Sequence, residues 1–219
     1  MNSCNILLSS NQFNQEEVYN ELKYILKPGM RVLILPFSYD YGWIPNNYEF
    51  EYRFSDEIGT HYKELIAPFY DYGIFSENIY IVNVYKDSRE FVETQMMKSD
   101  IIYLTGGDPR NFNIIIEKYY GKEFIKTLQD FPGIVMGFSA GAMAQLDEYL
   151  LYPYECDNIT EFSIEEGLNL VSENIDILVH YNVNNIEYKN ALIANHHLRP
   201  YIDKYYKLED GMYLIFYHW

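Results

Sequence analysis

Short apolar runs alternate with amphipathic segments along the chain up to about residue 144. Residues 31–36 (RVLILP) are almost continuously apolar and end in a proline, which is typical of a buried parallel strand. Residues 15–26 instead place Val18, Leu22 and Ile25 at helical spacing. This part of the chain therefore predicts strands and helices in regular succession.

Five strands and five helices are predicted in this part of the chain. The strands are residues 5–9, 31–36, 78–84, 101–105 and 133–137. The helices are residues 15–26, 56–70, 88–97, 112–120 and 123–130. Such alternation indicates βαβ units, so we expect an α/β fold, a three-layer sandwich with a mostly parallel sheet and helices on both faces. No repeat or low-complexity linker interrupts it, and residues 1–219 are expected to form one domain.

The pattern loosens after residue 144. Residues 149–162 are polar, acidic and rich in turn formers, which predicts a loop. An apolar run at 175–179 predicts a further strand, and residues 186–194 predict a helix. The last segment, 201–219, is expected to be hairpin-like, with a strand from residue 212 to the end.

The charge is acidic and unevenly placed. The 219 residues carry 16 Lys and Arg against 32 Asp and Glu, a formal net charge of −16. Because nucleic acids and anionic membranes attract basic patches, neither is an expected partner. No Lys or Arg occurs between Lys126 and Lys189, a span that holds eleven acidic residues and is expected to form a solvated face.

Cysteines and the N-terminus give no sign of a metal site or of export. Cys4 and Cys156 are too few for a disulfide framework, and no paired Cys or His spacing indicates zinc. The N-terminus lacks a basic segment followed by an apolar one, and no apolar run approaches the ~20 residues that cross a bilayer. We expect a cytoplasmic protein without a metal or other cofactor.

The most informative motif is Gly-Phe-Ser-Ala-Gly at residues 137–141, directly after a predicted strand. G-x-S-x-G at a strand-to-helix turn is typical of a nucleophile elbow, which lifts the hydroxyl of Ser139 to the edge of the sheet. A helix that begins at Ala140 would direct its first amides toward a developing oxyanion. The alternative is a glycine-rich turn with an incidental serine.

A second turn, Thr-Gly-Gly-Asp at residues 105–108, also follows an apolar strand. Adjacent glycines there allow backbone amides to approach a ligand, although a plain tight turn is equally compatible. Neither G-x-G-x-x-G nor G-x-x-x-x-G-K-[ST] occurs, so nucleotide binding has no support.

His180 is the strongest candidate for a general base among the five histidines. It follows the apolar run 175–179, so it would emerge at the carboxyl end of a strand, where ligands gather in open α/β sheets. The remaining histidines lie in a predicted helix, a polar turn or the chain end: His61, His196, His197 and His218. A structural role for His180 is the alternative.

The glycine pair, the GFSAGA sequence and the later histidine together resemble the peptidase E and cyanophycinase family of serine peptidases, from the first strand to about Met212. The resemblance implies a class I glutamine amidotransferase-like fold with serine in the elbow. It also implies that Ser139 attacks small peptides and that His180 accepts the serine proton. The oxyanion hole would combine the Ala140 amide with that of Gly107 or, alternatively, of Gly106.

The resemblance also implies an acid that orients the histidine. The loop between nucleophile and histidine offers Asp157, which we favour, and its neighbour Glu155. An acid before a late glycine offers Asp210, ahead of Gly211. For each of the three, the alternative is a surface acid without a catalytic role.

The substrate-binding residues are expected to be Gly106, Asp108 and Lys189. Peptidase E proper holds an N-terminal aspartate with an arginine after its histidine, yet no arginine lies between His180 and Arg199 here, and Lys189 is the nearest base. Lysine lacks the bidentate fork of arginine, and the acidic span would repel an acidic side chain. Aspartyl specificity is therefore disfavoured, and a free amino group is favoured.

The function that these features predict is a dipeptidase-like serine peptidase whose partner is a small peptide substrate. One alternative is an esterase or amidase of the α/β-hydrolase type, although some forty residues between Ser139 and His180 leave little room for its extra strands. Another alternative is a non-catalytic ligand-binding domain that keeps the elbow. A homodimer is compatible with the sequence.

Overall fold

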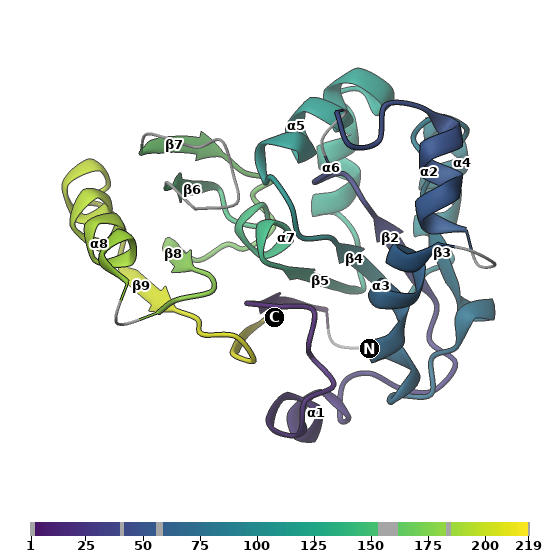
Figure 1. Cartoon of the computed structure of the whole chain (residues 1–219), viewed down its shortest axis with the longest axis horizontal. Helices are drawn as coiled ribbons and strands as arrows, with labels where there is room; N and C mark the ends of the chain where they lie inside the picture. The colour runs from purple at the N-terminus through teal and green to yellow at the C-terminus, as the bar shows by residue number, and fades with distance from the viewer. Residues whose placement is uncertain (1–2, 40–41, 56–58, 153–161, 183–184, 219) are drawn as a thin grey trace.

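Six strands form the central sheet of the computed structural model, which describes residues 3–39, 42–55, 59–152, 162–182 and 185–218 (Figure 1). In chain order the strands are β1 (Cys4–Leu8), β2 (Val32–Leu35), β3 (Ile79–Ile81), β4 (Ile101–Leu104), β5 (Ile134–Phe138) and β10 (Tyr213–Tyr217). Their order in the sheet is β10-β1-β5-β4-β2-β3. All neighbours pair in parallel except β10, which runs antiparallel to β1. The predicted mostly parallel α/β sheet is confirmed.

Helices cover both faces of this sheet. One face packs against α1 (Glu16–Leu22), α2 (Asn47–Phe54) and α3 (Thr60–Tyr70). The other packs against α4 (Arg89–Met96), α5 (Arg110–Ile115), the π-helix η2 (Ile116–Tyr120) and α6 (Glu123–Gln129). Within the described ranges, no helix combines the length and the apolar content that crossing a bilayer requires.

Inner strands of the sheet such as β2 and β4 are apolar at every position because both of their faces are buried. In β2, Val32 and Ile34 join the core on one side of the sheet, whereas Leu33 and Leu35 join the core on the other side. This alternation explains why the strands read as continuous apolar runs in the sequence.

The later part of the chain forms a third apolar cluster beside the sheet. It joins α7 (Ala140–Met143), β6 (Glu148–Leu151), β8 (Ile175–Leu178) and α8 (Ile186–Leu198). Two small sheets belong to this region: β6 pairs antiparallel with β7 (Ser163–Glu166), and β8 pairs in parallel with β9 (Lys204–Lys207). Figure 1 shows α8 and β9 at the opposite end of the molecule from α2 and α4.

Two local predictions are wrong, and helix α2 was missed. The segment 149–162 was expected to be a loop, yet Tyr149–Leu151 belong to strand β6; residues 153–161 lie outside the described residues. The hairpin expected over 201–219 does not form, because β9 pairs with β8 and β10 pairs with β1. Helix α2 was not predicted: Phe50 and Phe54 are its buried residues, and the rest of the helix is polar or tyrosine-rich.

Candidate active site

Ser139 lies at a sharp turn between β5, in the middle of the sheet, and α7. Its backbone has φ 50° and ψ −116°, a conformation that non-glycine residues rarely adopt. The turn is held from both sides. The Ser139 N–H donates to the Leu8 carbonyl at 2.9 Å, and the Ser139 carbonyl accepts from the amides of Ala142 and Met143 at 3.0 and 3.1 Å.

The two glycines that flank this turn are required by close backbone contacts. A Cβ at Gly137 would lie 2.2 Å from the carbonyl oxygen of Gly141, and a Cβ at Gly141 would lie 2.3 Å from that of Leu104. Neither distance leaves room for a side chain. The spacing of the G-x-S-x-G motif therefore reflects the tight packing of β5, α7 and the end of β4.

His180 reaches the serine from a different part of the chain. It lies two residues after β8, and its Nε2 is 2.9 Å from Ser139 Oγ. Its φ is 52°, and only one further non-glycine residue in the described structure, Asn169, shares a positive φ with Ser139 and His180. Two of the three residues with this unusual backbone conformation, Ser139 and His180, thus carry the side chains that contact each other.

Asp210 contacts the other side of the His180 ring. Its Oδ1 is 2.6 Å from His180 Nδ1, and it lies in the turn between β9 and β10, beside Gly211. The Asp210 side chain is 62% exposed, so water reaches this end of the arrangement. The favoured acid, Asp157, and Glu155 lie outside the described residues, and their role stays a prediction.

Ser9, at the end of β1, hydrogen-bonds the segment that carries His180 and the segment 208–212, and it thereby joins both to the central sheet. Its fully buried hydroxyl accepts the His180 N–H at 2.8 Å and donates to the Leu208 carbonyl at 2.9 Å. Its own N–H donates to the Met212 carbonyl at 3.0 Å. Ser9 was not among the predicted site residues, and its one sequence signal is a serine directly after an apolar strand.

The glycine pair lies next to the Ser139 turn, because the missing Cβ of Gly141 would also be 2.8 Å from the Thr105 carbonyl. Gly107 is exposed with φ 145°, whereas Gly106 is buried against the Phe138 ring. Among the described residues, neither the Gly107 nor the Ala140 amide donates a backbone hydrogen bond. An amide without a backbone acceptor is what an oxyanion hole requires of its donors.

Ser38 holds the glycine pair in place and was also missed by the sequence patterns. Its hydroxyl donates to the Gly106 carbonyl at 2.7 Å, and its own carbonyl accepts the Asp108 N–H at 3.0 Å. A Cβ on Gly107 would lie 2.7 Å from that same Ser38 carbonyl. The turn after β4 is therefore closely packed on the turn after β2.

Two predicted substrate-binding side chains do not reach the serine. The Asp108 carboxylate binds Arg110, with Arg110 Nε 3.0 Å from Oδ1, and it raises the pKa of that guanidinium. Lys189 is exposed on α8. Within the described structure, neither side chain contacts Ser139, His180 or Asp210.

A pocket of about 460 Å³ opens beside the Ser139 turn. It runs from Gly106 and Phe138 to helix α3, where Glu64 and His61 line it. Tyr39 completes this wall, and burial together with the Glu64 charge raises its pKa. The described part of the chain holds no cluster of three or more His, Cys, Asp or Glu side chains suited to a metal ion.

Comparisons with known proteins identify the family and the fold. The family model for Peptidase family S51 matches residues 60–218. Two solved structures share the fold: a protein assigned as a peptidase E from Listeria monocytogenes EGD-e, and a peptidase from an acI-B1 Actinobacterium. The first is 16% identical over 99% of this chain and 95% of its own, with a TM-score of 0.62; the second is 17% identical over 99% and 84%, with a TM-score of 0.63. No curated protein matches the sequence.

Proposed function

The chain belongs to peptidase family S51 and is a serine peptidase, and we propose that it hydrolyses small peptides as a dipeptidase-like enzyme with Ser139 as the nucleophile. The observation that carries the proposal is the line of contacts from Ser139 Oγ through the His180 ring to Asp210, at 2.9 and 2.6 Å. Both distances are those of hydrogen bonds, and the serine stands at the exposed end of a central strand.

In the proposed mechanism, Asp210 determines which nitrogen of His180 carries the proton. With Nδ1–H donating to Asp210, the Nε2 lone pair faces Ser139 Oγ and accepts its proton as the oxygen attacks the peptide carbonyl. The imidazolium that forms is stabilised by the Asp210 carboxylate. We propose Asp210 for this role on the strength of that contact, and Asp157 remains the alternative to be tested.

The oxyanion of the tetrahedral intermediate would be received by the amides of Ala140 and Gly107, with Gly106 as the alternative to Gly107. Support for this assignment comes from the exposure of Gly107 and the absence of backbone acceptors for these two amides among the described residues. His180 then donates its proton to the leaving amine. A water molecule, deprotonated by the same ring, hydrolyses the acyl-enzyme.

The proposal is tested by labelling with a fluorophosphonate and by a screen of dipeptides and tripeptides. We expect the native protein to be labelled at Ser139 and to cleave a subset of the peptides. Ser139→Ala should abolish labelling and lower the hydrolysis rate by at least about 10⁴-fold. Its thermal unfolding should change little, since the substitution only replaces the hydroxyl of a half-buried side chain by a hydrogen atom.

Ser10→Ala provides the matched control, since the Ser10 hydroxyl is buried without a hydrogen-bond partner in the described structure. It should retain labelling and activity. Hydrolysis of simple esters without any peptide cleavage would favour an esterase, and absence of labelling would favour a non-catalytic domain. Full peptidase activity in Ser139→Ala would overturn the assignment of the nucleophile.

A further inference from the structure

The pocket beside Ser139 has an apolar floor and one carboxylate at its wall. Phe138 and Gly106, which belong to the turns around the nucleophile, form its inner end, and Leu65 and Pro68 of α3 contribute apolar surface. Glu64 is the only described acidic residue that lines it. The lining therefore combines apolar surface, the residues Asn11, Gln12 and Asn14, and a single described carboxylate.

Glu64 is held in this position by its neighbours. The side-chain amide of Asn11 donates to the backbone carbonyl of Glu64 at 2.8 Å, while the Asn11 oxygen accepts the hydroxyl of Tyr103. His61, one turn earlier on α3, lies with Nδ1 3.3 Å from Glu64 Oε2. The His61 ring is itself packed edge-on against Trp43, with ring centroids 4.7 Å apart. The Glu64 backbone is thus held by Asn11, while its side chain is 71% exposed and has the His61 ring as a neighbour.

The charge of the pocket selects against acidic groups. Among the described residues, no Lys or Arg lines it, so no permanent cation is available to pair with a carboxylate. The field of Glu64 already reaches Tyr39, whose pKa it raises in addition to the effect of burial. An ammonium group is the complementary partner for this wall.

We propose that this pocket receives the substrate residue whose carbonyl Ser139 attacks, and that Glu64 pairs with an ammonium group of that residue. The inference rests on the proposed peptidase function and specifies its substrate class. The ammonium can be the free N-terminus of the peptide or the side chain of an N-terminal lysine. Peptides that begin with aspartate should bind poorly, because their carboxylate would face Glu64 without a cation nearby.

Binding to the Ser139→Ala protein tests the inference without depending on hydrolysis. Isothermal calorimetry would compare Lys-Leu with norleucyl-Leu, which differs by the loss of the side-chain ammonium, and each with its N-acetylated form. Asp-Leu is the acidic comparison. We expect Lys-Leu or the free N-terminal form to bind about three- to tenfold more tightly than its uncharged counterpart, an advantage that declines with added salt.

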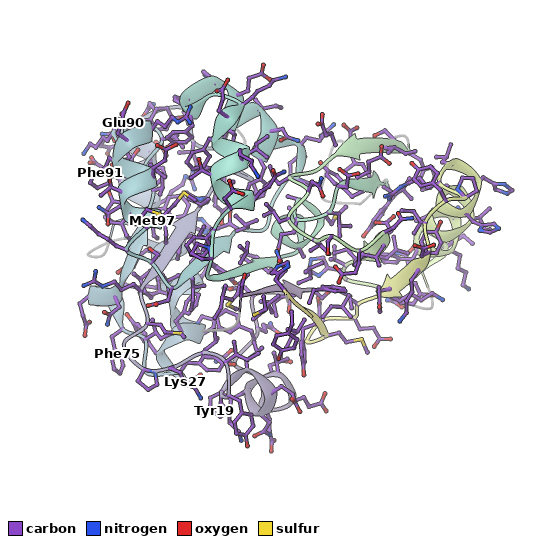
Figure 2. All side chains as sticks on the ribbon, turned by 180° about the vertical axis from the view of Figure 1, so that it is seen from behind. Tyr19, Lys27, Phe75, Glu90, Phe91 and Met97 are labelled. Carbon is purple, nitrogen blue, oxygen red and sulfur yellow. The ribbon has the colours of Figure 1, made fainter. Side chains whose placement is uncertain are left out.

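Glu64→Gln in the Ser139→Ala background should remove this advantage, because it keeps the shape of the side chain and loses its charge. The matched control is Glu90→Gln: Glu90 is exposed on α4, which packs on the other face of the sheet, and Figure 2 shows it at the outer edge of the molecule. Loss of the lysyl preference alone identifies the side chain as the source of the ammonium, and loss of the acetylation effect alone identifies the N-terminus.

Two results would overturn the inference: a preference for Asp-Leu, or charge preferences that survive Glu64→Gln. Failure of the proposed function is a separate result, since it appears as absence of peptide cleavage by the native enzyme. The same peptide series assayed with native and Glu64→Gln enzyme should then change in kcat/KM in the same order as the affinities.

Discussion

Ser139 and His180 are positioned in opposite ways. Ser139 is held by residues close to it in sequence, together with the strands that flank β5: its carbonyl accepts from Ala142 and Met143, and Gly137 packs against Gly141. His180 depends on distant segments, because its amide is bound by Ser9 and its ring by Asp210. One half of the site is a local turn, and the other is an assembly of three chain segments.

Because of this difference, the two halves of the site should be sensitive to different kinds of substitution. A local turn between buried elements is disturbed by crowding, since its two glycines lie against the backbone of adjoining elements. An assembly of segments is disturbed by loss of single hydrogen bonds, since each bond joins regions that no covalent turn holds together. Substitutions on either side should therefore fail in different ways, and the following four measurements test that expectation.

The largest effect is expected from Asp210→Asn. The amide retains the shape of the carboxylate but loses the charge that, in the proposed mechanism, stabilises the His180 imidazolium and selects its tautomer. We expect kcat to fall by roughly 10²–10⁴-fold with little change in KM. Asp157→Asn is the control and should remain active. If Asp157→Asn loses activity and Asp210→Asn keeps it, the acid comes from the segment that precedes the histidine.

Arg199→Met should be the most destabilising change in the region that carries the histidine. Arg199 and Asp176 are at most 1% exposed, their ion pair is 2.7 Å long, and Arg199 also donates to the Glu148 carbonyl at 2.7 Å. Removing the guanidinium leaves a buried carboxylate without its cation, at a cost of about 3–5 kcal/mol. Urea unfolding measures the loss, and the double variant with Asp176→Asn should recover part of it. An unchanged midpoint would show that the pair contributes nothing.

Gly141→Ala tests the local half of the site. Its methyl group would lie 2.3 Å from the Leu104 carbonyl, so backbone must move, and we expect a loss of about 2–4 kcal/mol together with the activity. Gly29→Ala is the control: Gly29 has φ +76° but no atom within 4 Å of the added carbon, so about 1 kcal/mol and no activity should be lost. A loss in Gly141→Ala no larger than that in Gly29→Ala would contradict crowding against Leu104 as the cause.

Ser9→Ala is expected to have the smallest effect and to act only through position. It removes the hydroxyl that joins His180 to the Leu208 segment, which should lower stability by about 1–2 kcal/mol. We expect kcat to fall about tenfold with KM unchanged, since the His180 ring loses its alignment while the pocket is intact. A parallel fall in the rate of fluorophosphonate labelling separates this from a purely structural role. Ser10→Ala should change neither rate.

The inner strands of the sheet were predictable because a strand that is buried on both faces reads as an apolar run, as β2 and β4 do. Partner choice was not predictable for β9 and β10, which are neighbours in sequence yet pair with β8 and β1. Strand pairing across the chain depends on which apolar faces meet in the folded state, and the local sequence pattern does not specify those faces.

The candidate site likewise has a part that was predictable from the sequence and a part that was not. The sequence by itself determined the Ser139 turn, because a strand, two glycines and a helix start are contiguous, and it placed His180 at a strand end. Only the tertiary structure brought Asp210 to the histidine and Ser9 between the two late segments. The physical reason is distance along the chain. Local steric constraints depend on adjacent residues, whereas a hydrogen bond between remote segments forms only after the core has placed them side by side.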